Sequence, residues 1–417
     1  MSDRLIPNLS DDQIPGEHGP TGAVGGDRMV LNFGPQHPAT HGTFRLLLEL
    51  DGERIVKCTQ YIGYLHSGFE KLGEHQTYDQ YVTVCDRINY MSPFANDLCW
   101  HMAVEKLYGL ECTDYTKLIR LILAEVARLE DHSFFLGTPA LDLGLVTGFL
   151  WSFVGREECY DVFEFVSGQR YMPGYTRTGG LMWDVPPDFA ERVRFVADRT
   201  PPELDDLVNL IERNPIWQSR AKGIGVITPE DVVDYGITGP NARASGVFRD
   251  LRKDQPYLGY EAFDFDIPTC SDGDCFDRFV VRVEEMRQSA RILQQAVKEL
   301  PRKAPQVNVD PARKVTLPPK ADVYTKMEEM IHHFELIMPN TAGGPPVGEA
   351  YVANETAMGE LGFYVISDGT KFPYRVRVRP PSFIHYAIFK KLIEGRLLSD
   401  VVSVLSSLNI IAAELDR

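Results

Sequence analysis

Two histidines stand four residues apart in a loop near the N-terminus, between the apolar runs Met29 to Phe33 and Phe44 to Leu50. The loop reads Gly-Pro-Gln-His-Pro-Ala-Thr-His-Gly, and its histidines are His37 and His41. Its two prolines fix φ and remove backbone donors, while the glycines at its ends permit conformations closed to other residues. The sequence therefore predicts a stiff hairpin tip that carries two imidazoles, which suits proton donation to a bound ligand.

Two other interpretations of this histidine pair stay open. Histidines in turns commonly form hydrogen bonds at the surface and have no further role. Imidazoles four residues apart are also spaced as metal ligands when they lie on a helix, but Pro38 stands between these two and excludes that helix. The metal interpretation is therefore the weaker one.

Longer stretches of the chain resemble one protein family, the 49 kDa subunit of respiratory complex I, the bacterial form of which belongs to the NADH:quinone oxidoreductase. The first matching stretches are LNFGPQHPATHG, YIGYLHSGFEKLGEHQTY, DRINYMSPFANDLCWHMAVEKL and LDLGLVTGFLW. Later ones are SGQRYMPGYTRTGG, RASGVFRDLRKDQPY, GDCFDRFVVRVEEMRQS, GELGFYVISDG and PYRVRVRPPSF. The resemblance runs from about Met29 to the C-terminus, and many long motifs in the same order make it specific.

The resemblance implies that the chain forms the quinone-reduction site of a proton-pumping enzyme. Reduction of a quinone takes two electrons and two protons, so the protein must present donors to two carbonyl oxygens. By resemblance these donors are His41 and Tyr90, and His37 is expected to support the loop at the quinone. An imidazole can give up a proton near physiological pH, whereas a phenol, with a pKa of about 10, normally donates only a hydrogen bond.

Asp142 lies in an otherwise apolar segment, where an ionised carboxylate is costly unless it is paired. The resemblance implies that its partner is His41, whose imidazole it would orient and whose pKa it would raise. A change of this contact on quinone reduction is our hypothesis for the start of coupling to proton pumping. From the residues alone, Asp142 fits a helix cap equally well, and Tyr90, one of 18 tyrosines, fits a packed core residue.

The seven cysteines form no Cys-x-x-Cys pair. The family resembles the large subunit of nickel–iron hydrogenases, whose metal is held by two such pairs, one near each end of the chain. The corresponding positions here read Arg87-Ile88-Asn89-Tyr90 and Leu408-Asn409-Ile410-Ile411. Without thiolates for a soft metal, we expect no metal and no cofactor on this chain, and cysteines that are reduced core residues.

Two positions depart from the family pattern. Ser67 stands where mitochondrial members carry an arginine that is modified, so that modification cannot occur here. Met172 stands where many members have a histidine near the terminal iron–sulfur cluster. Because a thioether does not titrate, we expect the potential of that cluster to depend less on pH than in relatives with the histidine.

The elements that must position these residues follow from periodicity and punctuation. Alternating segments predict an antiparallel sheet near the N-terminus and a second β element near the C-terminus. The predicted strands are 29–33, 43–50, 54–61, 351–355, 361–367 and 374–379. Predicted helices run from Thr113 or Asp114 to a closing Gly137, from Phe149 to Phe165 as a more fully buried helix, from Phe276 to Leu300 and from Asp322 to Met338.

Composition sets further limits. With 417 residues, of which 44% are hydrophobic and 24% charged, the chain is long enough for more than one core. A formal charge of -16 argues against a nucleic-acid surface or direct attachment to an anionic leaflet. No stretch approaches the roughly 20 apolar residues of a transmembrane helix, and residues 1–27 lack the zones of a signal peptide. We expect a bacterial protein, peripheral on the cytoplasmic side of the inner membrane.

The predicted fold class is α+β, a central helical bundle with small antiparallel β elements from both ends, like the large subunit of nickel–iron hydrogenases. The predicted parts are a flexible arm (1–27), an N-terminal β element with the quinone-site loop (28–65), a helical core (66–340) and a C-terminal β element with a tail (341–417). The resemblance implies as partners a small subunit carrying the terminal [4Fe-4S] cluster, a 30 kDa-type subunit, a membrane quinone-channel subunit and quinone itself.

Two alternatives to this function remain. One is the equivalent subunit of a related complex that takes electrons from ferredoxin or another donor, because the chain has no Gly-rich nucleotide fingerprint between a strand and a helix. The other is a scaffold without a catalytic part. In every case the chain is not expected to catalyse alone.

Overall fold

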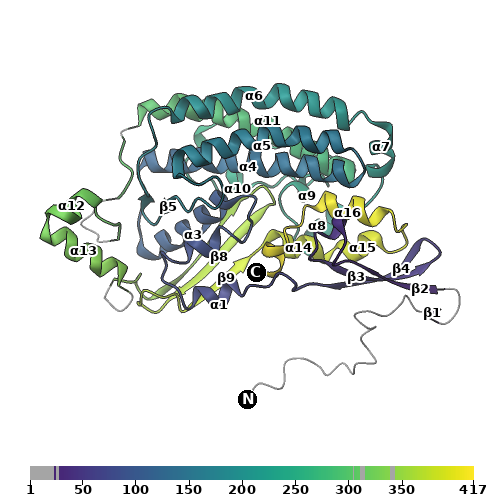
Figure 1. Cartoon of the computed structure of the whole chain (residues 1–417), viewed down its shortest axis with the longest axis horizontal. Helices are drawn as coiled ribbons and strands as arrows, with labels where there is room; N and C mark the ends of the chain where they lie inside the picture. The colour runs from purple at the N-terminus through teal and green to yellow at the C-terminus, as the bar shows by residue number, and fades with distance from the viewer. Residues whose placement is uncertain (1–22, 25–27, 304, 310–314, 339–342) are drawn as a thin grey trace, which may run out of the picture.

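Four long helices form a bundle across one side of the molecule (Figure 1). They are α4 (Asp114–Asp142), α5 (Val146–Ser167), α6 (Phe189–Ile211) and α11 (Cys275–Glu299), and each packs against its neighbours in the bundle. The computed structural model describes residues 23–24, 28–303, 305–309, 315–338 and 343–417. The arm predicted for residues 1–27 therefore lies outside the described residues, apart from Ala23 and Val24.

The helix α4 begins as predicted but does not end as predicted. The Thr113 side chain accepts a hydrogen bond from Thr116 N at 3.2 Å and caps the start of the helix. The helix then continues through Gly137 to Asp142. Gly137 serves a different purpose, because a Cβ at this position would lie 2.2 Å from Ser152 Oγ on α5. The glycine permits the close approach of two helices and does not end one.

The prediction that α5 is the more fully buried helix is wrong. α4 is buried on nearly all sides, whereas α5 keeps Leu150 62% and Trp151 45% exposed. The prediction for α11 is confirmed to within one residue at each end. After it, Pro301 lies in a short 3-10 turn, η3 (Leu300–Arg302).

The N-terminal residues form the predicted antiparallel sheet. Its strands are β1 (Ala23–Val24), β2 (Arg28–Phe33), β3 (Arg45–Asp51) and β4 (Arg54–Tyr61), paired in that order. Along β3 the side chains alternate between buried and half-buried, with Leu46, Leu48 and Leu50 on the core face. The prediction is confirmed because this alternation is regular.

The N-terminal sheet is held by the last part of the chain, which lies beside it in Figure 1. Ile55 N donates to Arg396 O at 2.9 Å, and Leu398 N donates to Glu53 O at 2.9 Å. The carboxylate of Asp416 accepts hydrogen bonds at 2.8 Å from the backbone N–H of both Gly63 and Leu65.

The C-terminal strands form a second sheet as predicted, with order β7 (Gly348–Glu355), β8 (Glu360–Ser367) and β9 (Arg375–Arg379). Helix α3 (Pro93–Tyr108) covers it, and the ring of Trp100 meets that of Phe363 at 5.6 Å in a core of its own.

Shorter elements complete the fold. They are α1 (Phe69–Gly73), α2 (Val82–Cys85), β5 (Thr176–Arg177), β6 (Gly180–Leu181), α7 (Pro215–Ala221), α8 (Pro229–Tyr235), α9 (Pro240–Arg243), α10 (Leu251–Asp254), α14 (Pro381–Ala387), α15 (Phe389–Ile393), α16 (Asp400–Leu408) and α17 (Ala412–Asp416). The single helix predicted for 322–338 is wrong, because extended backbone at Lys326 divides it into α12 (Lys320–Thr325) and α13 (Met327–Ile337).

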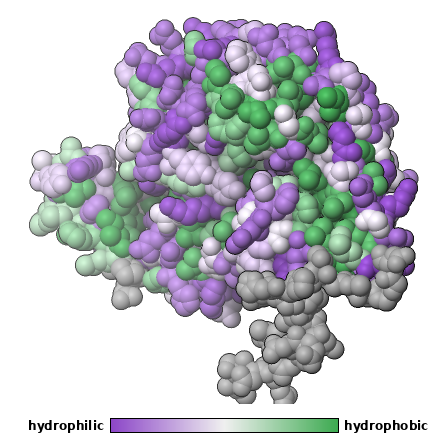
Figure 2. All heavy atoms as spheres, turned by 45° about the vertical axis from the view of Figure 1, so that its right-hand side comes forward, coloured by the Kyte–Doolittle hydropathy of each residue, from purple (hydrophilic) through white to green (hydrophobic). Residues whose placement is uncertain are grey.

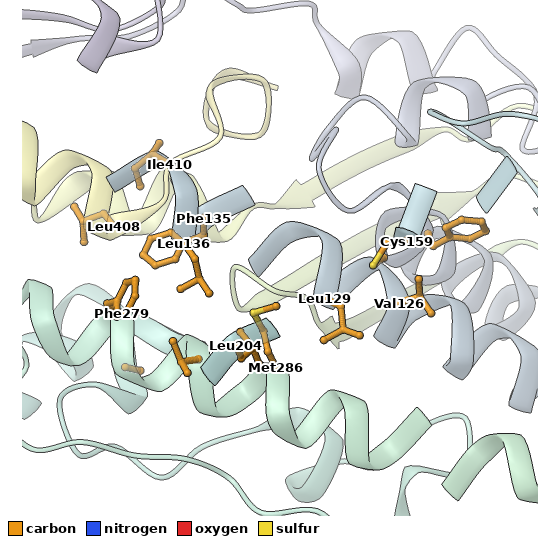
Figure 3. Packing of buried hydrophobic residues seen from close by; sticks show 14 of the residues in the cluster. Val126, Leu129, Phe135, Leu136, Cys159, Leu204, Phe279, Met286, Leu408 and Ile410 are labelled. Carbon is orange, nitrogen blue, oxygen red and sulfur yellow. The ribbon is translucent and has the colours of Figure 1, made fainter. Parts of the chain in front are cut away.

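The main hydrophobic core joins the bundle, the N-terminal sheet and the C-terminal helices. In Figure 3, Leu408 and Ile410 lie near Phe135 and Leu136 of α4, while Met286 of α11 lies deeper in the bundle. None of the helices in the described ranges combines the length and the apolar character that crossing a bilayer requires. The molecule is a mixed helix and sheet protein of the α+β class.

Candidate functional site

The loop between β2 and β3 is folded tightly, and His37 holds it. Gly34 adopts φ 82°, and a Cβ there would lie 2.2 Å from Phe44 O, so no larger residue fits. A single 3-10 turn, η1 (Pro38–Thr40), fills the loop. His37 Nδ1 accepts a hydrogen bond from Ala39 N at 3.1 Å, and its ring lies 4.3 Å from that of Phe33.

His41 follows this turn with its backbone in the left-handed region, at φ 54°. Its backbone N–H donates to Pro38 O at 3.1 Å, which fixes the backbone, while its side chain is exposed at the tip of the loop. The ring centroid lies 6.1 Å from that of Phe44. Atoms packed around the imidazole remove part of its hydration and lower the pKa of His41, so the ring is neutral at neutral pH.

Tyr90 lies between α2 and α3, half-buried against a small apolar cluster. The cluster consists of Met91, Met358 and Ile411, with Phe134 beside it. Loss of hydration, and then the nearby carboxylate of Asp131, raise the pKa of Tyr90 above its usual value. The phenol is therefore a stable hydrogen-bond donor at neutral pH.

The two segments that correspond to the metal-binding pairs of hydrogenases meet at one carboxylate. Asp131, fully buried on α4, lies 3.4 Å from Asn89 Nδ2 and 3.5 Å from Asn409 Nδ2, so each amide donates a long hydrogen bond to it. Burial raises the pKa of Asp131 to about 6, and the Asn89 amide partly opposes this shift. Tyr90 follows Asn89 directly, and Ile411 lies two residues after Asn409.

Asp142 is the last residue of α4 and is half-buried. Burial alone raises the pKa of its carboxyl to about 6. Across the described ranges, no hydrogen bond or ion pair connects Asp142 with His41, and neither group affects the pKa of the other. Their pairing stays a prediction.

The structure thus brings Tyr90 together with the C-terminal segment 408–411, and it places the loop of His41 on α16, the helix that leads into that segment. No hydrogen bond or ring contact between described residues joins His41, Tyr90 and Asp142 to one another.

Sequence reasoning missed Asp131 and the buried charges around it. Arg243 Nε donates to Glu285 Oε1 at 2.7 Å, and His132 Nε2 lies 2.9 Å from the other Glu285 oxygen, all fully buried. Burial opposes ionisation of Glu285, but Arg243 outweighs it and holds the pKa of this carboxyl well below its usual range. A signal was present in the sequence: the run Glu130 to Ser133 interrupts a helix that is otherwise apolar. Four consecutive polar residues in a buried helix must find partners inside the protein.

All seven cysteines are free thiols, six of them buried and Cys270 partly so. Within the part of the chain that the structure describes, no group of three or more His, Cys, Asp or Glu side chains is arranged to hold a metal ion.

Comparison with known proteins gives consistent matches, all of them to the D-type chain of NADH-quinone oxidoreductases. Residues 142–417 match the family described as the 49 kDa subunit of the respiratory-chain NADH dehydrogenase. The chain of this type from Methylacidiphilum infernorum is 47% identical over 397 residues, which are 95% of this chain and 94% of that protein. The one from Solibacter usitatus is 46% identical over 415 residues, 98% of this chain and 100% of the relative. The one from Geobacter sulfurreducens is 45% identical over 390 residues, 93% and 98% of the two chains.

Proposed function

The chain belongs to the family of the 49 kDa subunit of the respiratory-chain NADH dehydrogenase, and we propose that within this multi-subunit NADH-quinone oxidoreductase it forms the site of quinone reduction. The proposed site is shared with a small neighbouring subunit that carries a terminal [4Fe-4S] cluster and delivers the electrons. A 30 kDa-type subunit and a membrane quinone-channel subunit complete the proposed surroundings.

One observation carries this proposal: segments from both ends of the chain meet at Asp131, with Tyr90 and the loop of His41 beside the meeting point. In a hydrogenase-like arrangement, which we propose for this fold, these segments would hold a metal. Here they offer Asn89 and Asn409 and apolar side chains in place of thiolates. Such a surface suits a flat apolar ring with two polar ends better than it suits a soft metal.

The proposed chemistry divides the two quinone oxygens between two donors. Tyr90 holds one carbonyl oxygen with a hydrogen bond, and its raised pKa keeps the phenol protonated. His41 serves the other oxygen. Two-electron reduction places negative charge on the quinone, which favours the imidazolium form of His41, so a ring that is neutral beforehand takes up a proton and passes it to the quinone oxygen.

Coupling would begin at Asp142. With a pKa raised to about 6, its carboxyl changes its charge at slightly acidic pH and responds to small changes nearby. If the carboxylate turns towards His41, it raises the pKa of the imidazole, and it loses that partner when His41 gives up its proton. We propose this exchange as the first step of proton translocation.

The proposal includes the organisation of the chain into an N-terminal β element with the loop (28–65), a helical core (66–340) and a C-terminal β element with a tail (341–417). It places the subunit on the cytoplasmic side of a bacterial inner membrane, as part of a proton-translocating enzyme that needs its partners for activity. A related complex supplied by ferredoxin would use the same site, and the donor is decided by subunits other than this one.

The test compares wild type with Tyr90→Phe and His41→Ala in the assembled complex in native membranes. Tyr374→Phe and His75→Ala, both at positions outside the site, are the matched controls. We expect NADH:quinone reductase activity to fall in the two site variants while NADH:ferricyanide activity and the native-gel band persist. Full quinone activity in both variants would reduce the chain to a scaffold, and quinone activity driven by ferredoxin but not by NADH would establish the related complex.

A further inference from the structure

Two short helices project from the molecule with their apolar side chains outward. Helices α12 and α13 pack on each other, and neither contains a buried residue. Figure 1 shows them at the left, apart from the bundle, and in Figure 2 hydrophobic side chains gather on this projecting part. We call residues 320–338 the projecting helices.

The apolar residues of α13 and the residue after it form a single stripe. They are Met327, Met330, Ile331, Phe334, Ile337 and Met338, at the spacing of one helix face, and they are between 43% and 68% exposed. The half-buried residues of the helix, His332, His333 and Leu336, lie on the opposite face. A helix that completes the core of its own chain turns its apolar face inward, so this helix has the reverse orientation.

The projecting helices are held in place and are not a loose arm. The ammonium group of Lys371 donates to the backbone oxygens at the end of α13, to Leu336 O at 3.3 Å, Met338 O at 2.8 Å and also Glu335 O. A cation at this end of a helix satisfies carbonyl groups that lack partners and is favoured by the helix dipole. Tyr108 Oη donates to Gly343 O at 2.9 Å and ties down the segment that follows.

The size of the stripe matches one side of a protein interface. Its exposed apolar surface is on the order of 700 Å², larger than the patches of most monomers and close to the roughly 800 Å² that each partner contributes to a standard interface. Because the orientation of α13 is fixed beforehand, docking loses little conformational freedom.

Charge identifies the partner. The projecting helices carry four carboxylates against two lysines, and Glu328 and Glu335 follow one edge of the stripe. This excess of negative charge opposes an anionic membrane surface, and it opposes pairing with a second copy of the same face. We propose that the stripe docks into an apolar groove bordered by lysine and arginine side chains on a neighbouring subunit of the same complex, as a helix in a groove. This inference does not depend on the quinone site.

The first experiment is photo-cross-linking in the assembled complex in native membranes. The photoreactive amino acid p-benzoylphenylalanine replaces Phe334 on the stripe or, as the matched control, His333 on the opposite face. We expect the probe at 334 to join one other subunit, at an apolar peptide with lysine or arginine close by, and the probe at 333 not to reach that peptide. Adducts with lipid, with a second copy of this chain or with no subunit would each overturn the proposal.

A second experiment measures retention of the subunit. The double variant Ile331→Gln/Phe334→Gln should lower the fraction of the chain retained in the washed complex by about tenfold or more, the effect of losing one packed aromatic anchor. His333→Gln should have no such effect. Since the stripe is not buried in this chain, circular dichroism of the full chain should be unchanged. Glu328→Lys should weaken retention more than Glu328→Gln, most strongly at low salt. Unchanged retention in the double variant and in Glu328→Lys would refute the groove and its basic border.

Discussion

Replacement of Asp131 by asparagine should make the stability of the protein less dependent on pH. Asp131 is fully buried, and its pKa is raised from 3.8 to about 6 because burial penalises the charged form. The folded state therefore binds this proton more tightly than the unfolded state. The corresponding stability is present below pH 3.8 and is lost as the pH rises through 6.

The magnitude follows from the size of this shift. A shift of about two pKa units corresponds to roughly 3 kcal/mol, and about 1.4 kcal/mol of it is lost between pH 5 and pH 8. Asparagine removes the titration and keeps the shape. The Asn89 side-chain oxygen already accepts a hydrogen bond from Met91 N at 3.1 Å, so we expect Asn409 to turn its amide and accept from the new side chain. The variant should lose only about 1 kcal/mol through its weaker hydrogen bonds.

The assay is denaturant unfolding of the full chain at pH 5 and pH 8. The difference in unfolding free energy between Asp131→Asn and wild type should shift by about 1.4 kcal/mol in favour of the variant at the higher pH. Asp206→Asn, at an exposed position on α6, is the control and should show no such shift. A difference that is constant between pH 5 and pH 8 would refute the argument, because Asp131 would then not titrate in this range.

Two further outcomes follow from single positions. Gly137→Ala should destabilise the chain by about 1–2 kcal/mol, since the added Cβ meets Ser152 Oγ, and Ser152→Ala in the same chain should recover most of that loss; thermal unfolding measures both, and a neutral Gly137→Ala would contradict the close crossing of α4 and α5. Met172→His should increase the pH dependence of the potential of the neighbouring cluster, up to about 59 mV per pH unit, in a redox titration followed by electron paramagnetic resonance; a full slope already in the wild type would refute the expectation.

Much of the fold could be predicted because its signals are local. The strands of both sheets alternate in hydrophobicity residue by residue, and α11 has a helical period over its whole length. The failures have physical causes that are not local. Gly137 looked like a helix end because glycine commonly ends helices, but contact with another helix decides its role. The break at Lys326 carries no proline or glycine, so nothing in the sequence around it indicated the turn.

The candidate site could be predicted in part. His41, Tyr90 and Asp142 were selected by resemblance, and the fold of the loop explains why His37 accompanies His41. Asp131 could not be selected, because its importance comes from Asn89 and Asn409, which lie far apart in the chain and approach each other only through the fold. Periodicity describes neighbours along a helix or strand and contains no information about such pairs.

The hydrogen bonds from Gly63 and Leu65 to Asp416 set an order on biosynthesis. The two bonds close loops of 353 and 351 residues, so the segment that follows the N-terminal sheet has no native anchor of this kind until the ribosome has reached Asp416. The first strands to emerge must wait for α17, which is a late and slow kind of contact. A chain that terminates before Asp416 would keep its bundle sequence intact and still lack the clasp that joins these two segments. The clasp therefore acts as a built-in check that only copies extending through Asp416 pass.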